Sequence, residues 1–506
     1  MRPFRLGAVV ALCLMASTVR AQVQPSSAPG VGLLQMVTSA IARHPTDLLQ
    51  QQQVAIATGT LQAAEGQFDP LLSTSVKRQR TNQPLLLSQQ NPIADTALQN
   101  LTVYSVGLQK QFRTGLTITP SVGMSRTDLN LSQPAYGQSS EAVTVTQPLA
   151  RGRGREAVTS GVQSAQASLA ANEQAYRYTA SSVAGTCAAA YWSYVAAYQV
   201  VGVAQAAVAR SRQLLADVQQ LVAADQQPAA DLKQLQAELA SRTVQALIAQ
   251  QQLVAARYQL GMAAGLDATE MAALPTPADD FPVPSAGLSL SDEALLREAM
   301  AQRADLRAAR EQIRSAQETV VAAKDATRPQ INLSATFGFA GLDQGAGVDQ
   351  YFRPLFNQLT GGNVTVALNY QWPIANNVAF GQLAQSQAAA DSASIREQDA
   401  ERTVASQVAV AVSGVRLAIS QVEAATQEAT LYRSAVDDER TKMQLGLSTV
   451  LDLIVTEDRL TQAEVDAITA KATYAQAVVQ LRFSTGTILT SAPAPQVSDA
   501  TLLTLP

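Results

Sequence analysis

Three arginines alternate with glycines in the stretch LARGRGRE, which places Arg151, Arg153 and Arg155 within five residues. Short Arg-Gly runs can bind nucleic acid, so the first chemistry to consider is a phosphate-binding arm. The charge of the chain argues against it: the formal net charge is −4, and it becomes −7 if an N-terminal segment carrying three arginines is removed. An acidic chain repels a polyanion. Nucleic acid is therefore not an expected partner.

The residues that most often carry catalysis are scarce. His44 is the only histidine, and Cys187 is the only cysteine beyond Cys13. Nucleophilic and acid–base sites combine such residues in constellations, and we find none, nor a phosphate loop, a metal cluster or a nucleotide fingerprint. The sequence predicts no enzyme activity, no cofactor and no metal. His44, next to Pro45, is interpreted as a surface or capping residue, and Cys187 as a small packing residue in a helix.

The N-terminus reads as a secretory signal peptide over residues 1–21. Arg2 and Arg5 precede an apolar run, and Val19 and Ala21 are small residues before the predicted cleavage site. The run is too short to span a bilayer, and we expect no membrane-spanning helix elsewhere. Cys13 lies inside the apolar run, which disfavours lipidation.

Self-comparison reveals two copies of one plan. Pro148 and Pro373, each at the end of an alternating run, are 225 residues apart, and so are Gly261 and Gly486. At the front of each half, the segment from His44 parallels that from Gln302, with Asp47 matching Asp305. The first half has 34 more residues in its strand-like part. The Arg-Gly run is thus one of two strand-to-helix joints.

Each half predicts a helix, strands, a long helix, a turn and a second helix. We expect a first repeat over residues 22–262, a Pro-rich linker over 263–290, a second repeat over 291–487 and a C-terminal tail over 488–506. The predicted helices are residues 32–67, 155–224, 230–261, 292–327, 378–445 and 449–485. The segment from Arg155 would be on the order of 100 Å long, which suits side-by-side coiled-coil packing rather than a compact domain.

The strand-like parts, residues 70–149 and 330–373, show period-two alternation. Val364, Val366, Leu368, Tyr370 and Trp372 share one face of a predicted strand, with polar or small residues between them. Such runs are typical of membrane-spanning β-strands, although a soluble sheet packed on helices gives the same pattern. The signal peptide and the absence of predicted membrane helices favour a membrane β-barrel.

Two helix–strand–helix repeats, a mid-chain linker and a signal peptide together resemble the outer-membrane efflux protein family, the TolC-like channels. The segments that carry the resemblance are RADL at residues 303–306, the joints at Pro148 and Pro373, SAQASL at 164–169 and QLGLSTVLDLIVTEDRLTQAE at 444–464. The implied fold is mainly α with a membrane β-barrel portion: a homotrimer with a shared outer-membrane barrel and a long periplasmic α-helical barrel.

The resemblance also implies partners and a location. Such channels lie in the outer membrane of Gram-negative cells, contact outer-membrane lipid, and dock onto a periplasmic adaptor and an inner-membrane transporter. They serve tripartite efflux pumps or type I secretion systems as passive ducts. A secreted or periplasmic coiled-coil scaffold without channel activity is the alternative, and a stand-alone diffusion porin is a third possibility that the long helices disfavour.

The number of barrel strands departs from the family, whose members commonly give two strands per half. The first half here predicts four strands, at residues 71–80, 101–111, 115–126 and 143–149. A trimer would have 12 barrel strands if the extra hairpin stays outside the barrel, or 18 if it inserts. We expect 12, because the helical layout matches the family.

By the same resemblance, two helix–helix turns form the periplasmic tip. Gly446, Leu447, Ser448 and Thr449 are expected to dock the adaptor, although Gly446 can also simply cap the end of one helix, and Ser448 or Thr449 the start of the next.

Asp452 matches an aspartate that lines the tip constriction in relatives, where three copies would form a ring favouring cations. Relatives can carry a further aspartate and an arginine where this chain has Val455 and Ser448, so a salt-bridge latch is not expected there. The predicted periplasmic gate comprises Asp452, Leu451, Val455, Asp225 and Asp231. A solvated helix-face acid is the plainer interpretation of Asp452.

The arginines of the joint can now be placed at the inner edge of the outer membrane. Arg151, Arg153 and Arg155, with Trp372 and Tyr370, are the predicted membrane-interface residues, where the arginines would meet lipid phosphates or neighbouring subunits. Solvated turn charges are the alternative for the arginines.

Overall fold

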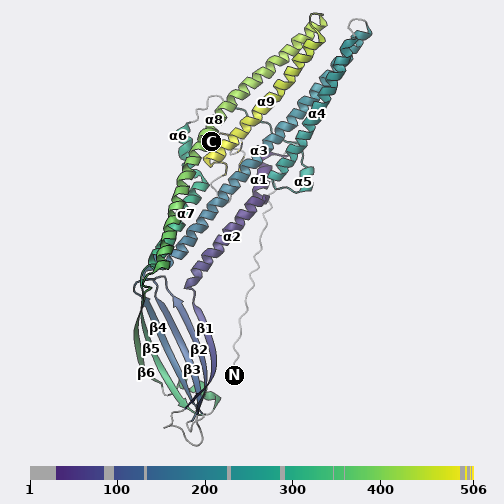
Figure 1. Ribbon diagram of the computed structural model, residues 1–506. Helices are drawn as coiled ribbons and strands as arrows, with labels where there is room; N and C mark the ends of the chain where they lie inside the picture. Colours follow the sequence, from purple (N-terminus) through teal and green to yellow (C-terminus); the bar gives the residue numbers. More distant parts are fainter. Residues whose placement is uncertain are drawn as a thin grey trace, which may run out of the picture.

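A computed structural model of the protein describes residues 30–84, 96–129, 134–224, 229–284, 291–345, 347–357, 359–489, 496–498, 502 and 504–505. The predicted signal peptide and the gate residue Asp225 lie outside these residues. The described chain is elongated: a curved sheet forms one end, and long helices continue from it to the other (Figure 1).

Both repeats follow the same order of elements. The first contains α1 (Leu33–Arg43), α2 (Pro45–Glu65), β1 (Leu71–Pro84), β2 (Thr96–Gln111), β3 (Thr117–Leu129), β4 (Tyr136–Pro148), α3 (Arg155–Ala223) and α4 (Ala230–Ala263). After the short α5 (Ala268–Ala272), the second contains α6 (Asp292–Gln302), α7 (Ala304–Ala326), β5 (Gln330–Gln344), β6 (Thr360–Gln371), α8 (Asn377–Gln444) and α9 (Val450–Thr485).

The helices expected over residues 32–67 and 292–327 are each broken near the front. His44 is extended, with φ −64° and ψ 129°, because the following proline disfavours helical geometry in the residue before it. The chain re-enters a helix at Pro45, and the His44 ring accepts a hydrogen bond from the Thr46 backbone N–H at 3.3 Å. His44 is therefore a helix cap, as the sequence predicted.

No proline explains the second break, which falls at Arg303. Its backbone has φ −62° and ψ 124°, and its guanidinium donates to both oxygens of Asp305, at 3.0 and 2.7 Å. The same guanidinium reaches Gln407 on α8 at 2.6 Å. The extended backbone at Arg303 thus turns a nearly buried cation toward the carboxylate and toward α8.

All six strands form one antiparallel sheet in the order β1-β2-β3-β4-β5-β6 (Figure 1). The extra hairpin of the first half, β2–β3, is part of this sheet, while the expected 12 strands of a trimeric barrel stay a prediction. Strands β2 and β3 pair with each other along most of their length, and they pair with β1 and β4 on their other sides. Removing them would leave backbone groups of β1 and β4 without partners.

The two faces of the sheet differ in polarity. The register places on one side, here called the apolar face, the residues Leu72, Val76, Tyr104, Val106, Leu108, Ile118, Val122, Met124, Val143, Val145, Ile331, Leu333, Phe337, Phe339, Val364, Val366, Leu368 and Tyr370. The opposite side, here called the polar face, carries mainly serine, threonine, asparagine and glutamine. Alternation along each strand therefore becomes a two-sided sheet, as expected.

The chain between β5 and β6 folds back over the apolar face, at the end of the sheet far from the helices. The Ser139 hydroxyl donates to the Pro354 carbonyl at 2.7 Å, and Tyr351 meets Tyr104 edge to face with ring centroids 5.6 Å apart. Arg126 donates to the Gly347 carbonyl at 2.9 Å. These contacts fix the segment against β2, β3 and β4.

A buried aromatic cluster joins the helices at mid-length. Tyr191 of α3 is fully buried and donates to the Val31 carbonyl at 3.0 Å and to the Asp279 carboxylate at 2.8 Å. Trp192 packs on Phe281 with ring centroids 5.6 Å apart. The N-terminal segment and the linker are thereby held against α3. Cys187 is fully buried in the same cluster, as expected of a packing residue.

Among the described helices, only α8 contains an 18-residue stretch apolar enough to cross a membrane by length and composition. The sequence analysis expected no such helix. These two properties are weak evidence for a membrane span, because the core helix of a water-soluble region has them too. One third of the stretch is buried, and residues such as Val404, Val408 and Val412 belong to the core that α8 shares with α6 and α9.

The two repeats give their matching aspartates different surroundings. Asp305 pairs with Arg303, whereas Asp47 is fully buried in the first turn of α2 and neither of its oxygens has a hydrogen-bond partner among the described residues. Burial raises the pKa of the Asp47 carboxyl to about 6. Because the native state binds this proton more tightly than the unfolded state, ionisation of Asp47 lowers the free energy of unfolding. This loss of stability is absent below about pH 4 and complete above about pH 6.

We predict that Asp47→Asn raises the thermal unfolding midpoint above pH 6, with a gain in stability of about 1–2 kcal/mol that disappears below about pH 4. The matched control is Asp305→Asn, which leaves the nearly buried Arg303 without its carboxylate and should lower the midpoint at neutral pH. Thermal scans of the purified protein across this pH range measure both. A lower midpoint for Asp47→Asn at pH 7 would contradict the prediction.

Candidate functional site

The turn between α8 and α9 forms an exposed tip at the end farthest from the sheet (Figure 1). Gly446 has φ 73°, and the backbone N–H groups of Gly446 and Leu447 donate back to Met443 and Lys442 at 3.0 and 2.9 Å. This is the glycine-capped helix end called a Schellman motif. It leaves the Leu447 side chain 75% exposed at the apex.

Thr449 and Asp452 cap the start of α9 reciprocally. The Asp452 backbone N–H donates to the Thr449 hydroxyl at 3.2 Å, and the Asp452 carboxylate accepts from the Thr449 backbone at 3.2 Å and from its hydroxyl at 2.6 Å. The Thr449 hydroxyl, then its backbone N–H, and the Lys442 charge hold the pKa of Asp452 below its usual value. Asp452 is therefore an exposed, ionised carboxylate held in place by a cap.

Ser448 also has a defined partner. Its hydroxyl donates to the Glu439 carboxylate, which Lys442 contacts as well at 3.0 Å. The Ser448 hydrogen bond, followed by that from Lys442, lowers the pKa of Glu439. The tip is thus a polar turn held by its own hydrogen bonds, with the apolar residues Leu445 and Leu447 exposed at its apex.

The other predicted gate residues are only partly brought together. Leu451 and Val455, one turn apart on α9, are 52% and 41% exposed. Asp231 lies in the first turn of α4, in the other hairpin. Asp225 lies outside the described residues. Within the described chain, no hydrogen bond or ion pair connects Asp231 to Asp452.

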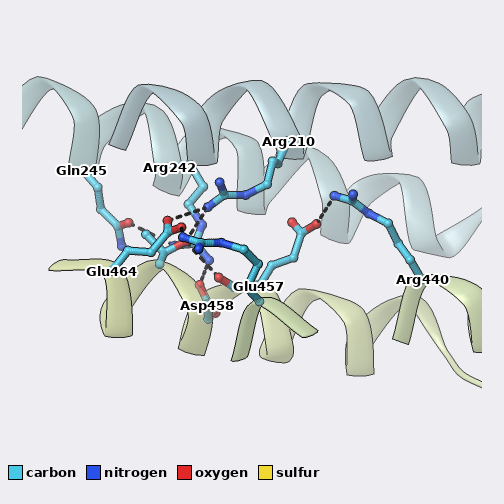
Figure 2. Close-up of polar contacts among 9 residues, drawn as sticks. Arg210, Arg242, Gln245, Arg440, Glu457, Asp458 and Glu464 are labelled. Atoms are coloured by element: carbon cyan, nitrogen blue, oxygen red, sulfur yellow. Dashed lines mark hydrogen bonds and ion pairs between the residues drawn. The ribbon is translucent and has the colours of Figure 1, made fainter. Parts of the chain in front are cut away.

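The sequence analysis missed a set of ion pairs that joins the two helical hairpins below their tips (Figure 2). Arg210 of α3 contacts Glu464 of α9 at 3.7 Å and donates to Thr461 at 3.1 Å. Arg433 of α8 reaches the other oxygen of Glu464 at 2.8 Å. Glu464 thus bridges arginines from both hairpins.

A second bridge uses α4. The Arg242 side chain, 6% exposed, contacts Glu238 on its own helix at 2.5 Å and Asp458 on α9 (Figure 2). On the other side of α9, Glu457 pairs with Arg440 of α8 at 2.8 Å. The three acids of α9 lie within the stretch 444–464 that carried the family resemblance. These acids could be seen in the sequence, but their partners on α3 and α4 are more than 200 residues away along the chain.

The residues predicted for the membrane interface do gather at one level, where the sheet meets the helices. Arg151, Arg153 and Arg155 are exposed and have no ion pair within the described chain, and Tyr370 at the end of β6 is 65% exposed. The turn depends on glycine: Gly152 and Gly154 have φ of 77° and 92°. The Gly152 N–H donates to Asp325 at 2.7 Å, which ties this joint to the end of α7.

Within the described residues, no group of three or more histidine, cysteine, aspartate or glutamate side chains could hold a metal ion. The tip and the interhairpin ion pairs are therefore the candidate functional sites, and their chemistry is electrostatic and mechanical.

Residues 295–487 match the model of the outer membrane efflux protein family. None of the curated protein sequences compared with the chain is a match. Several solved structures do match along most of the chain.

The Campylobacter jejuni CmeC outer membrane channel has 15% identity and a TM-score of 0.67, over 93% of this chain and 87% of that one. The outer membrane protein VceC of Vibrio cholerae has 17% identity and a TM-score of 0.65, over 90% and 96%. The open state of the Neisseria gonorrhoeae MtrE outer membrane channel has 17% identity and a TM-score of 0.63, over 90% and 88%.

At these identities the structures establish the fold, and the family model adds a sequence match over the second repeat. The matched family and these three structures are described as outer-membrane proteins, which agrees with the expected location. The predicted resemblance is confirmed: the chain has the TolC-like fold, and its second repeat matches the outer membrane efflux protein family.

Proposed function

We propose that the protein is the outer-membrane channel of a tripartite efflux pump or a type I secretion system, and that it works as a homotrimer. The observation that carries this is the combination, in one chain, of an open sheet with an apolar face and helices of about 70 residues that continue from it to an exposed tip. A sheet that is apolar on one face and polar on the other suits a water-filled membrane barrel, and the helices suit a periplasmic extension.

The helices support association as strongly as the sheet does. Next to the sheet, α2, α3, α7 and α8 pack in that order as a row. The two end helices keep uncovered apolar side chains at this level, among them Leu49 and Ile56 on α2 and Val378 and Ile395 on α8, all more than 60% exposed. In the trimer, α8 of one chain packs on α2 of the next, and the row closes into an α-helical barrel.

The inner edge of the outer membrane lies at the joint between sheet and helices. Arg151, Arg153 and Arg155 contact lipid phosphates there, because they are exposed and have no carboxylate partner among the described residues. Tyr370 and Trp372 lie at the same level, where aromatic rings are favoured at a membrane surface.

The tip is the site of adaptor docking and of channel gating. The apex of the α8–α9 hairpin, Gly446, Leu447, Ser448 and Thr449, receives a periplasmic adaptor that links the channel to an inner-membrane transporter. Asp452, with Leu451 and Val455, lines the constriction, and Asp225 and Asp231 contribute from the other hairpin. The bridges through Glu464 and Asp458, together with the buried cluster around Leu214, Leu235 and Leu453, hold the two hairpins together, so opening the tip requires these contacts to change.

The test of this function is the location and mass of the full-length product. Extracted from outer membranes with mild detergent, it should have a protein mass near three chains. A water-soluble monomer or dimer would instead support the scaffold alternative.

We predict that Glu464→Gln raises the conductance of the closed channel in planar bilayers. The substitution removes the charge that bridges Arg210 and Arg433, and an ion pair worth about 0.5–1.4 kcal/mol corresponds to a two- to tenfold change in the open population. Asp399→Asn is the matched control, since Asp399 pairs with Arg402 in an exposed contact within α8 alone. Equal conductance of Glu464→Gln and the unaltered channel would refute the role of this bridge.

We predict that Asp452→Asn weakens block by divalent cations added on the tip side by about tenfold, because the substitution removes three negative charges from one ring. Asparagine still accepts the capping hydrogen bonds, so the trimer should remain intact. The control is Asp466→Asn, an exposed acid farther along α9. Unchanged block in Asp452→Asn would place the constriction elsewhere.

Docking of the adaptor at the apex predicts that Leu447→Asp reduces cross-linking of the tip to the adaptor in intact cells at least severalfold, since a charge replaces an apolar residue that is 75% exposed. Gln427→Asp, at an exposed position along α8, should cross-link normally. Both variants are expected to form trimers. Normal adaptor cross-linking by Leu447→Asp would argue against this apex as the docking point.

A further inference from the structure

The sheet of one chain ends in two open edges. Strand β1 pairs only with β2, and β6 pairs only with β5, so the far edge of each has no partner strand among the described residues. Nearly all residues of both strands are exposed. Unpaired backbone of this kind is very costly inside a bilayer, where no water is available to satisfy it.

The two edges complement each other in direction and in polarity. Strand β1 runs away from the helices and β6 runs back toward them, so two chains side by side bring them together antiparallel (Figure 1). On the apolar face, β6 presents Val364, Val366 and Leu368, and β1 presents Leu72 and Val76 nearer the helices, followed by Arg78 and Arg80 farther along. Pairing the edges would therefore continue the apolar face over the part of β1 nearer the helices.

We propose that β1 of each chain pairs with β6 of the next, that all six strands enter the membrane wall, and that three chains close an 18-stranded barrel. The inference rests on the proposed trimeric channel and goes beyond it, because a trimer could also close with fewer strands.

The pattern of the middle strands argues that they belong in the wall. Tyr104 and Val106 of β2 and Val122 and Met124 of β3 continue the apolar face between β1 and β4. A hairpin outside the membrane would not need an apolar face, because it would not contact lipid. Cross-strand hydroxyl contacts also tie the strands together on the polar face, such as Ser75 with Ser105 at 2.7 Å and Thr144 with Thr336 at 2.9 Å.

Strand number sets the width of the passage. With strands about 4.8 Å apart and tilted about 40°, 18 strands give a barrel about 36 Å across between backbones, compared with about 24 Å for 12. The described strand residues on the polar face include a single charged side chain, Lys77; the other charges of the strands lie on the apolar face, mostly near its two ends. The lumen is accordingly wide, lined by hydroxyl and amide groups, and nearly neutral, so the membrane barrel limits cargo by size rather than by charge.

Disulfide trapping in native outer membranes tests the closure. In a Cys187→Ala background, Val76→Cys is combined in turn with Val364→Cys, Val366→Cys and Leu368→Cys, since the register across the seam is open. Oxidation should link neighbouring chains in at least one combination and give covalent trimers on a denaturing gel. Loss of free thiols in Ser75→Cys/Ser105→Cys and Met124→Cys/Ser139→Cys, within single chains, should show that β1–β2 and β3–β4 are paired in the same particles.

The decisive control replaces the β1 cysteine with Met124→Cys on β3. If β3 links to β6 of the neighbouring chain while β1 does not, β1 and β2 lie outside a 12-stranded barrel and the inference is wrong. Native mass measured in parallel separates the two proposals. An intact trimer without any β1–β6 link overturns the 18-stranded barrel alone, whereas loss of the trimer from the membrane overturns the proposed channel as well.

Discussion

The backbone at the two open edges of the sheet is the constraint on which the rest of the structure depends. A single chain supplies an apolar face that suits lipid and a polar face that suits water, but six strands do not close a barrel wide enough to hold a water-filled passage. Because peptide groups inside a bilayer must be hydrogen-bonded, the sheet requires further copies of itself. Cyclic symmetry meets this requirement most simply, since each copy offers one edge of each kind.

The helical part also requires further copies of the chain, because of uncovered apolar side chains rather than unpaired backbone. A row of four helices keeps apolar residues uncovered at its two ends, so the closure that completes the sheet also completes the row. The buried cluster around Tyr191 and Trp192 then fixes the N-terminal segment and the linker across the middle of the helices. Beyond that level, the hairpins are joined by a smaller buried cluster that includes Leu214, Leu235 and Leu453, and by ion pairs that can exchange with water.

Much of this architecture could be predicted from the sequence. The 225-residue offset between Pro148 and Pro373 revealed the repeats, because the two segments resemble each other in sequence. Period-two alternation located the strands, because it is a pattern within each segment. His44, next to Pro45, was interpreted as a surface or capping residue, but the helix expected over residues 32–67 was not predicted to break there. The break at Arg303 was missed, since it depends on a guanidinium that meets Asp305 and Gln407 only in the folded chain.

The candidate site was less accessible to sequence reasoning. A cap at Ser448 or Thr449 was expected, but the Asp452 carboxylate three residues on was not predicted as the reciprocal partner of Thr449. The bridges from Arg210 and Arg242 to α9 join segments more than 200 residues apart, and no pattern within either segment specifies the partner. The place of the extra hairpin was not predicted for a related reason: likeness to the family suggested four barrel strands per chain, whereas β2 and β3 pair on both sides and join all six strands in one sheet.

The central claim is that one chain supplies only part of the barrel wall, and that further copies of the same chain complete it. Electron cryomicroscopy of the full-length protein in lipid nanodiscs tests it most directly. The account predicts a three-fold particle in which each chain contributes six contiguous strands to a closed barrel, with the helices continuing from it on one side of the membrane. A particle whose membrane wall closes within one chain, or whose sheet lies outside the lipid, would contradict it.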